Sequence, residues 1–179
     1  MKKYHFLIAV LIIVLASCST PKTYFTPQIR GRVEQGKVPL AKLQYYVDRD
    51  VELRRELVTG ETKVSSGKVK FIDGKYVNVI VLKKNTRGVC TMSQPDKIMI
   101  SFEVGEGKFI TFGKTKAGSN TDPYRILANV WVKDCGEIEY EGKKYFIQPA
   151  GTEASIMIKK SVFRKSEFKT RTMKGVKVS

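Results

Sequence analysis

The chain has 179 residues, of which 42% are hydrophobic and 28% charged, and this length suffices for one domain with a real core. It contains neither an internal repeat nor a low-complexity tract, which excludes repeat architectures. Its formal charge of +16 at neutral pH indicates anionic partners.

The N-terminus combines a basic start with an apolar run. Lys2 and Lys3 precede the uninterrupted apolar residues 6–16, which is the order of charge and hydrophobicity in a secretory signal. The run is too short to span a bilayer as a permanent helix. It ends in Leu15-Ala16-Ser17-Cys18, a leucine and two small residues followed directly by a cysteine.

These four residues resemble the lipobox of bacterial lipoproteins, and the resemblance covers residues 1–18. It implies that residues 1–17 are removed and that Cys18 becomes a lipidated first residue carrying diacylglycerol and an N-acyl chain such as palmitate. Ser19 resembles an outer-membrane sorting signal, which implies a lipid-anchored protein of the cell outer membrane that faces the periplasm. The alternative is an ordinary signal peptide with a coincidental cysteine.

Cleavage before Cys18 changes the composition of the mature chain. Loss of Lys2 and Lys3 leaves 31 basic residues against 17 acidic ones, a formal charge of +14. His5, the one histidine, is also lost. Ser-His-acid and Cys-His catalysis are therefore excluded, and we predict a protein that is not an enzyme.

The mature chain divides into a tether and a body. Residues 18–37 carry two prolines and two glycines among polar residues with little periodicity, which predicts a lipidated, flexible tether. Residues 38–179 are expected to form a single β-rich domain with a basic C-terminal strand or arm.

Short strands separated by glycine turns dominate the body. Asp73-Gly74 between residues 68–72 and 75–82 is the strongest hairpin signal. Two further hairpins are predicted, one with Glu141-Gly142 between residues 137–140 and 144–147, and one with a turn at residues 105–107 between 98–104 and 109–112. Strands also fit residues 124–132, 153–160 and 162–170. Residues 40–57 could form a helix, but two strands with a bend near Asp48 fit better.

This pattern predicts an all-β fold, either a single antiparallel β-barrel or a two-sheet sandwich built from hairpins. Cys90 and Cys135 remain after lipidation of Cys18, and an oxidising compartment predicts a disulfide between them. Two buried free thiols are the alternative.

Basic residues concentrate at the C-terminus. With Glu167 the one acid after residue 158, the segment is expected to bind an anionic partner, either anionic lipid or an acidic envelope protein rather than nucleic acid. A solvated face without a specific partner is the alternative. The predicted binding residues are Lys159, Lys160, Arg164, Lys165, Lys169, Arg171, Lys174 and Lys177.

Motifs for cofactors and metals are weak. Gly113-Lys114-Thr115 lacks the leading glycine of a P-loop, because position 108 is lysine. Asp48, Asp50 and Glu52 alternate, as they would on one face of a strand, but a solvated face neutralised by arginines fits better than a calcium site. We predict neither a cofactor nor a metal.

Two functions from different classes remain. The first is a non-catalytic, membrane-anchored envelope lipoprotein that acts as a docking or structural component of a membrane-associated assembly. The second is a small-ligand or lipid carrier with an apolar barrel interior, which requires a cavity of about 300 Å³ or more.

Overall fold

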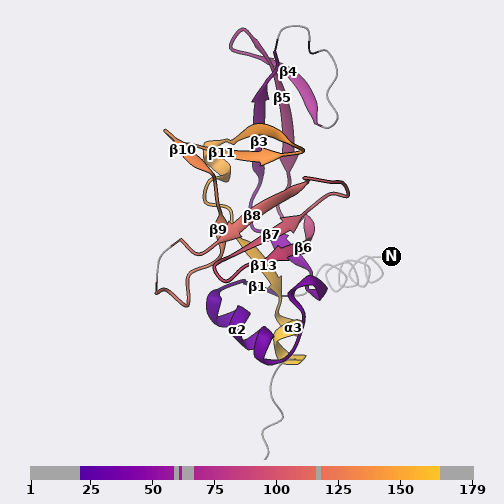
Figure 1. The fold of residues 1–179 in the computed structure, drawn as a ribbon, viewed down its shortest axis with the longest axis vertical. Helices are drawn as coiled ribbons and strands as arrows, with labels where there is room; N and C mark the ends of the chain where they lie inside the picture. The colour runs from indigo at the N-terminus through magenta and orange to yellow at the C-terminus, as the bar shows by residue number, and fades with distance from the viewer. Residues whose placement is uncertain (1–20, 59–60, 62–66, 116–117, 166–179) are drawn as a thin grey trace, which may run out of the picture.

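A computed structural model describes residues 21–58, 61, 67–115 and 118–165, with the side chains of residues 163–165 left out of the description. The described chain forms two antiparallel sheets (Figure 1). The first sheet has seven strands, in the spatial order β1 (Lys22–Tyr24), β13 (Ile156–Lys159), β2 (Tyr45–Val47), β6 (Arg87–Ser93), β7 (Lys97–Ser101), β8 (Phe109–Gly113) and β9 (Arg125–Ile126).

The second sheet has six strands. Their spatial order is β10 (Val130–Val132), β11 (Cys135–Tyr140), β12 (Lys143–Ile147), β3 (Val51–Glu56), β5 (Lys75–Leu82) and β4 (Lys68–Ile72). Among the described strands neither sheet closes on itself, since β1 and β9 end the first and β10 and β4 end the second. Of the two predicted architectures, the fold is therefore the two-sheet sandwich of hairpins.

The predicted hairpins are confirmed. Asp73 and Gly74 have φ of 48° and 79°, and Glu141 and Gly142 have φ of 55° and 67°. Both pairs thus occupy the left-handed region that a two-residue type I′ turn requires, and they join β4 to β5 and β11 to β12. The third hairpin joins β7 to β8 through a longer loop after Ser101.

One predicted strand is two strands in different sheets. Residues 124–132 contain β9 at the edge of the first sheet and β10 at the edge of the second, and residues 127–129 carry the chain across. Two strands with a bend near Asp48 are confirmed as β2 and β3, preceded by a 3-10 turn at Leu40–Lys42.

The predicted tether at residues 18–37 is wrong for its described part. Residues 22–24 form β1, and α2 (Pro27–Gln35) follows with Thr26 as its N-cap. Phe25 and Val33 are fully buried and Ile29 is nearly so. These three residues are spaced four apart, which is the helical repeat of an apolar face, so the segment packs into the core instead of staying mobile.

The predicted C-terminal strand at residues 162–170 is also wrong in its described part. Residues 160–165 form the helix α3 (Lys160–Lys165), which follows β13 directly, while residues 166–170 lie outside the described residues. In Figure 1 α3 stands beside α2 at the lower end of the molecule, and the two helices are in contact.

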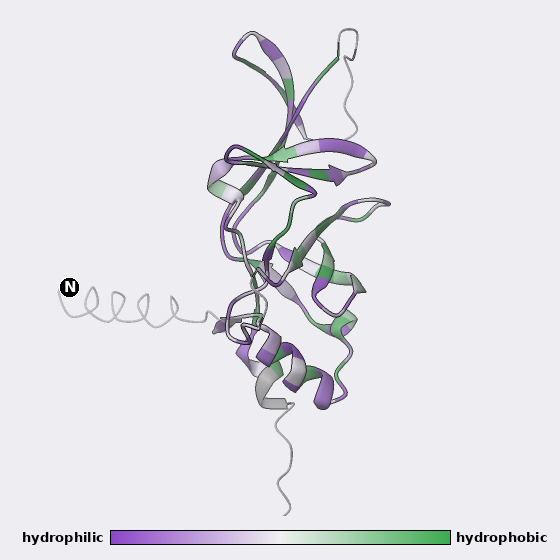
Figure 2. Ribbon diagram, turned by 60° about the vertical axis from the view of Figure 1, so that its left-hand side comes forward, coloured by the Kyte–Doolittle hydropathy of each residue, from purple (hydrophilic) through white to green (hydrophobic). Residues whose placement is uncertain are grey.

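The core lies between the two sheets and α2. In Figure 2 the strands alternate between hydrophobic and hydrophilic residues, as expected where one face of each strand is buried. Leu53 and Ile147 of the second sheet belong to the same buried cluster as Ile100 and Phe112 of the first.

The predicted disulfide is absent, and both thiols are free. Cys90 lies in β6 of the first sheet and points into the core, where its Sγ donates to the Met92 carbonyl at 3.3 Å and burial raises the pKa of its thiol. Cys135 is the first residue of β11 in the second sheet and is half-buried. The two cysteines thus lie in strands of different sheets, and no disulfide joins them.

Candidate functional site

The two ends of the described chain lie side by side. Lys22 of β1 pairs with Lys159 of β13, and the Lys160 amide donates to the Pro21 carbonyl at 2.9 Å. Cys18, the predicted lipidation site, lies outside the described residues but precedes Pro21 by only three positions. Three residues span at most about 10 Å. A lipid on Cys18 would therefore sit near the point where the basic C-terminal segment begins.

The structure places only part of the predicted anion-binding segment. Lys159 is half-buried in β13 and Lys160 is exposed at the start of α3. Arg164 and Lys165 lie in α3, and their side chains are outside the description. Lys169, Arg171, Lys174 and Lys177 lie outside the described residues.

Lys22 adds a cation to this end that sequence reasoning did not include. Its Nζ donates to Asn85 Oδ1 at 2.7 Å and lies 4.4 Å from the centre of the Tyr46 ring. Lys22, Lys159 and Lys160 define what we call the basic end of the molecule. Lys22 could have been included only if the pairing of β1 with β13 had been predicted. The prediction of a tether at residues 18–37 left no strand there to pair.

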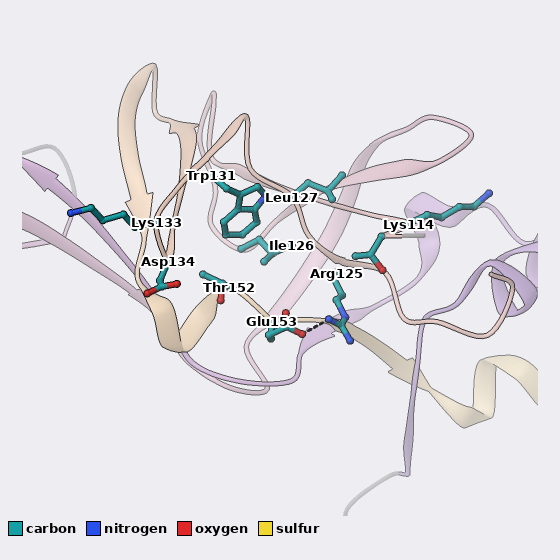
Figure 3. A pocket seen from close by; sticks show the side chains of 10 residues that line it. Lys114, Arg125, Ile126, Leu127, Trp131, Lys133, Asp134, Thr152 and Glu153 are labelled. Carbon is teal, nitrogen blue, oxygen red and sulfur yellow. Dashed lines mark hydrogen bonds and ion pairs between the residues drawn. The ribbon is translucent and has the colours of Figure 1, made fainter. Parts of the chain in front are cut away.

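A hollow of about 540 Å³ lies where the edges of the two sheets meet (Figure 3). Its wall includes Trp131 of the edge strand β10, which is 47% exposed. The Trp131 ring rests on Gly136 of β11, where a Cβ would come within 2.8 Å of the ring. A side chain at Gly136 would thus displace the tryptophan from this wall.

The charged groups of this hollow are largely paired. Arg125 forms an ion pair with Glu153 across the floor (Figure 3), and Lys114 pairs with Asp96 at 2.8 Å. Lys133 and Asp134 form the turn after β10, and neither makes an ion pair with another described residue. The hollow therefore offers an aromatic wall and a rim of mixed charge.

Two smaller spaces bear on the predicted carrier. An apolar space of about 130 Å³ lies between the sheets, with Leu53, Ile80 and Ile110 among its walls. It is smaller than a typical small-molecule site. A groove of about 340 Å³ lies between β8 and β11, where Phe109 and Ile138 contribute apolar walls.

The acidic residues Asp48 and Asp50 after β2 have different hydrogen-bond partners. Asp48 Oδ1 accepts from the Ser155 amide at 2.8 Å, whereas Asp50 accepts from Lys83 Nζ at 2.8 Å and from the Lys84 amide at 2.7 Å. Its hydrogen bond to Lys83 holds the pKa of Asp50 below the usual value. In the described part of the chain no group of three or more His, Cys, Asp or Glu side chains is placed to hold a metal ion.

A bidentate ion pair stabilises the base of the β4–β5 hairpin. Arg55 of β3 donates to the two carboxylate oxygens of Glu61 at 2.8 and 2.6 Å, and Lys143 of β12 lies 3.4 Å from the same carboxylate. The hydrogen bond from Arg55 is the main cause that lowers the pKa of Glu61 to about 2.

The β4–β5 hairpin itself projects beyond the rest of the sandwich, at the end opposite α2 and α3 (Figure 1). Phe71 and Tyr76 are cross-strand partners beside its turn and are 66% and 63% exposed. Their ring centroids are 5.1 Å apart. Sequence reasoning found this hairpin but not its exposure, because the pattern of a strand does not show where its sheet outruns the opposite layer.

Comparisons with known proteins give no family or relative. No protein-family model matches the chain, and no curated protein or solved structure matches it. Within the described ranges, none of the helices has the length and apolar character needed to span a bilayer.

Proposed function

We propose that the protein is a non-catalytic envelope lipoprotein, tethered to the outer membrane through Cys18, that docks a partner in a membrane-associated assembly. The observation that carries this proposal is the meeting of the chain ends at the basic end, where the Lys160 amide bonds to the Pro21 carbonyl. Since the three residues from Cys18 to Pro21 span at most about 10 Å, this bond supports a lipid anchor close to the start of the basic segment.

The lipid would act as a permanent anchor. Each buried methylene contributes about 0.8 kcal/mol, so a single chain binds a membrane only marginally, whereas diacylglycerol plus an N-acyl chain holds stably. Because β1 follows Cys18 after only a few residues and is paired with β13, the folded body begins close to the membrane surface. The proposed anchor therefore requires no long flexible spacer between the lipid and the folded body.

The basic end then faces the lipid head groups. Lys22, Lys159 and Lys160 lie together there, and the C-terminal basic residues follow in the sequence. Each lysine or arginine near an anionic surface contributes about 1 kcal/mol. The anionic partner predicted for this segment is thus lipid, and the surfaces farther from the anchor remain for a protein partner.

The anchor and the basic segment can be tested separately. Cys18→Ala should move the protein from the outer-membrane fraction to a soluble or unprocessed form, and normal membrane fractionation of this variant would contradict the anchor. For the basic segment, both the natural sequence and the triple variant Lys165→Glu, Lys169→Glu and Arg171→Glu are prepared without the signal peptide and the lipid. The triple variant should then lose binding to vesicles containing phosphatidylglycerol while keeping its circular dichroism spectrum. Neutral phosphatidylcholine vesicles are the control, and equal binding of the triple variant and the natural protein to the anionic vesicles would contradict the lipid-facing role.

The carrier function has one observation in its favour, the groove of about 340 Å³ between β8 and β11. That volume lies at the lower end of small-molecule sites. A carrier should release a defined lipid when the purified protein is extracted and analysed by mass spectrometry. Thr111→Trp, at a half-buried position that lines the same groove, should abolish that lipid without affecting membrane fractionation.

A further inference from the structure

The edge strand β4 has an outer edge that no other described strand covers. Among the described residues β4 pairs only with β5, and its register with β5 is continuous from Lys68 to Ile72. We propose that β4 accepts an extended strand of an acidic protein partner, in which acidic residues alternate with apolar ones. The inference rests on the proposed docking role and names the chemistry of the partner.

The backbone of β4 presents free hydrogen-bonding groups at this edge. A type I′ turn at residues 73–74 is closed by a bond between the residues that flank it. Because bonded and non-bonded pairs alternate in an antiparallel ladder, Lys70 and Lys68 bond to β5, whereas the N–H and C=O groups of Val69 and Phe71 point away from it. An added strand can bond to these outward groups.

The two faces of β4 differ in chemistry. Val69 and Phe71 lie on the same face, 42% and 66% exposed, and continue the core face of the second sheet beyond the end of the first. Lys68 and Lys70 lie on the opposite face, both are exposed, and neither forms an ion pair with another described residue. A partner strand would therefore place apolar residues beside the first face and acidic residues beside the second.

Two other occupants of this edge, a second copy of the chain and a membrane, fit the structure less well. Two copies paired through β4 would bring Lys68 and Lys70 opposite like charges, which destabilises cross-strand pairs and is a common means of preventing edge-to-edge association. The position of the hairpin argues against a membrane as the occupant of this edge, since the hairpin stands at the end opposite the basic end (Figure 1). An acidic strand is the occupant that satisfies both the backbone and the charges.

The test uses the full chain in mild detergent and two capped seven-residue peptides. One alternates glutamate with valine, and the other alternates lysine with valine. Amide hydrogen exchange followed by NMR should show slower exchange at Val69 and Phe71 with the glutamate peptide and no change with the lysine peptide. Lys68→Glu combined with Lys70→Glu should reverse this preference.

A proline variant separates strand addition from simple charge attraction. Val69→Pro removes an outward N–H while leaving the bonds of Lys68 and Lys70 to β5, so it should weaken glutamate-peptide binding at least tenfold without changing the melting temperature by more than a few degrees. Equal binding of both peptides, or binding unaffected by Val69→Pro, would overturn the proposal. So would slowed exchange of these amides by self-association or by phosphatidylglycerol vesicles. Cys18→Ala leaves this result unchanged, so failure of the anchor and failure of the edge are distinguishable.

Discussion

Two aromatic pairs at opposite ends of the molecule have similar geometry but different surroundings. Phe25 and Tyr45 have ring centroids 5.4 Å apart, and both side chains are fully buried between the first sheet and α2. Phe71 and Tyr76 have centroids 5.1 Å apart, but both are mostly exposed on the β4–β5 hairpin. A ring contact alone therefore does not indicate a role in folding.

The difference in burial between the two aromatic pairs indicates different roles for the two ends of the molecule. Burial of Phe25 removes a large apolar area from water, which stabilises the fold around the point where the chain emerges from the predicted anchor. Exposure of Phe71 leaves a similar area in water, beside lysines that make no ion pair with other described residues. Under the proposed function, the first region holds the protein at the membrane and the second meets the partner.

The largest expected effect is the contrast between two truncations. Phe25→Ala should lower the free energy of unfolding by about 3–5 kcal/mol, because it leaves a cavity among buried rings. Phe71→Ala should lower it by less than about 1 kcal/mol, because the ring is mostly in water already. Urea unfolding of the two variants gives both values. Similar losses of unfolding free energy would contradict different roles for the two ends.

A medium effect is expected at the start of α2. The Thr26 Oγ1 accepts from the Ile29 amide at 3.2 Å, so Thr26→Ala should cost about 1 kcal/mol by removing the N-cap. Thr26→Ser keeps the hydroxyl and serves as the control. Thermal unfolding should rank the natural protein and the serine variant above the alanine variant. Equal stability of Thr26→Ala and Thr26→Ser would mean that α2 does not depend on this cap.

The smallest effect is a pH dependence at the base of the hairpin. The pKa of Glu61 lies at about 2 instead of the ordinary 4.5, so its carboxylate stabilises the folded state fully above about pH 4.5. That stability is lost as the pH falls from 4.5 towards 2 and the carboxylate becomes protonated. Glu61→Gln should therefore melt below the natural protein at pH 7, and the gap should close at pH 2. A gap that stays constant between these values would show that the charge of Glu61 is not its cause.

Much of the fold could be predicted from local sequence. Asp73-Gly74 and Glu141-Gly142 determine their own turns, because both residues of each pair take positive φ, and the strands on either side follow. The choice between barrel and sandwich could not be made this way, since it depends on residues 127–129 moving the chain from one sheet edge to the other.

The errors have physical causes. The prediction of a tether at residues 18–37 is wrong because the prolines and glycines of this segment obscure the four-residue spacing of Phe25, Ile29 and Val33. The predicted disulfide is wrong because it rests on compartment and cysteine count, whereas the fold places Cys90 and Cys135 in different sheets as free thiols. The exposed edge of β4 could not be foreseen, because exposure depends on the length of the opposing sheet.

The most direct test measures which end of the lipidated protein faces the membrane. A fluorescent noncanonical residue placed at Lys160 or at Asp73 serves as donor, and the acceptor dye is attached to lipid head groups of reconstituted vesicles. The account predicts strong energy transfer from position 160 at the basic end and weak transfer from position 73 at the hairpin turn. Equal transfer from both positions, or stronger transfer from position 73, would contradict it.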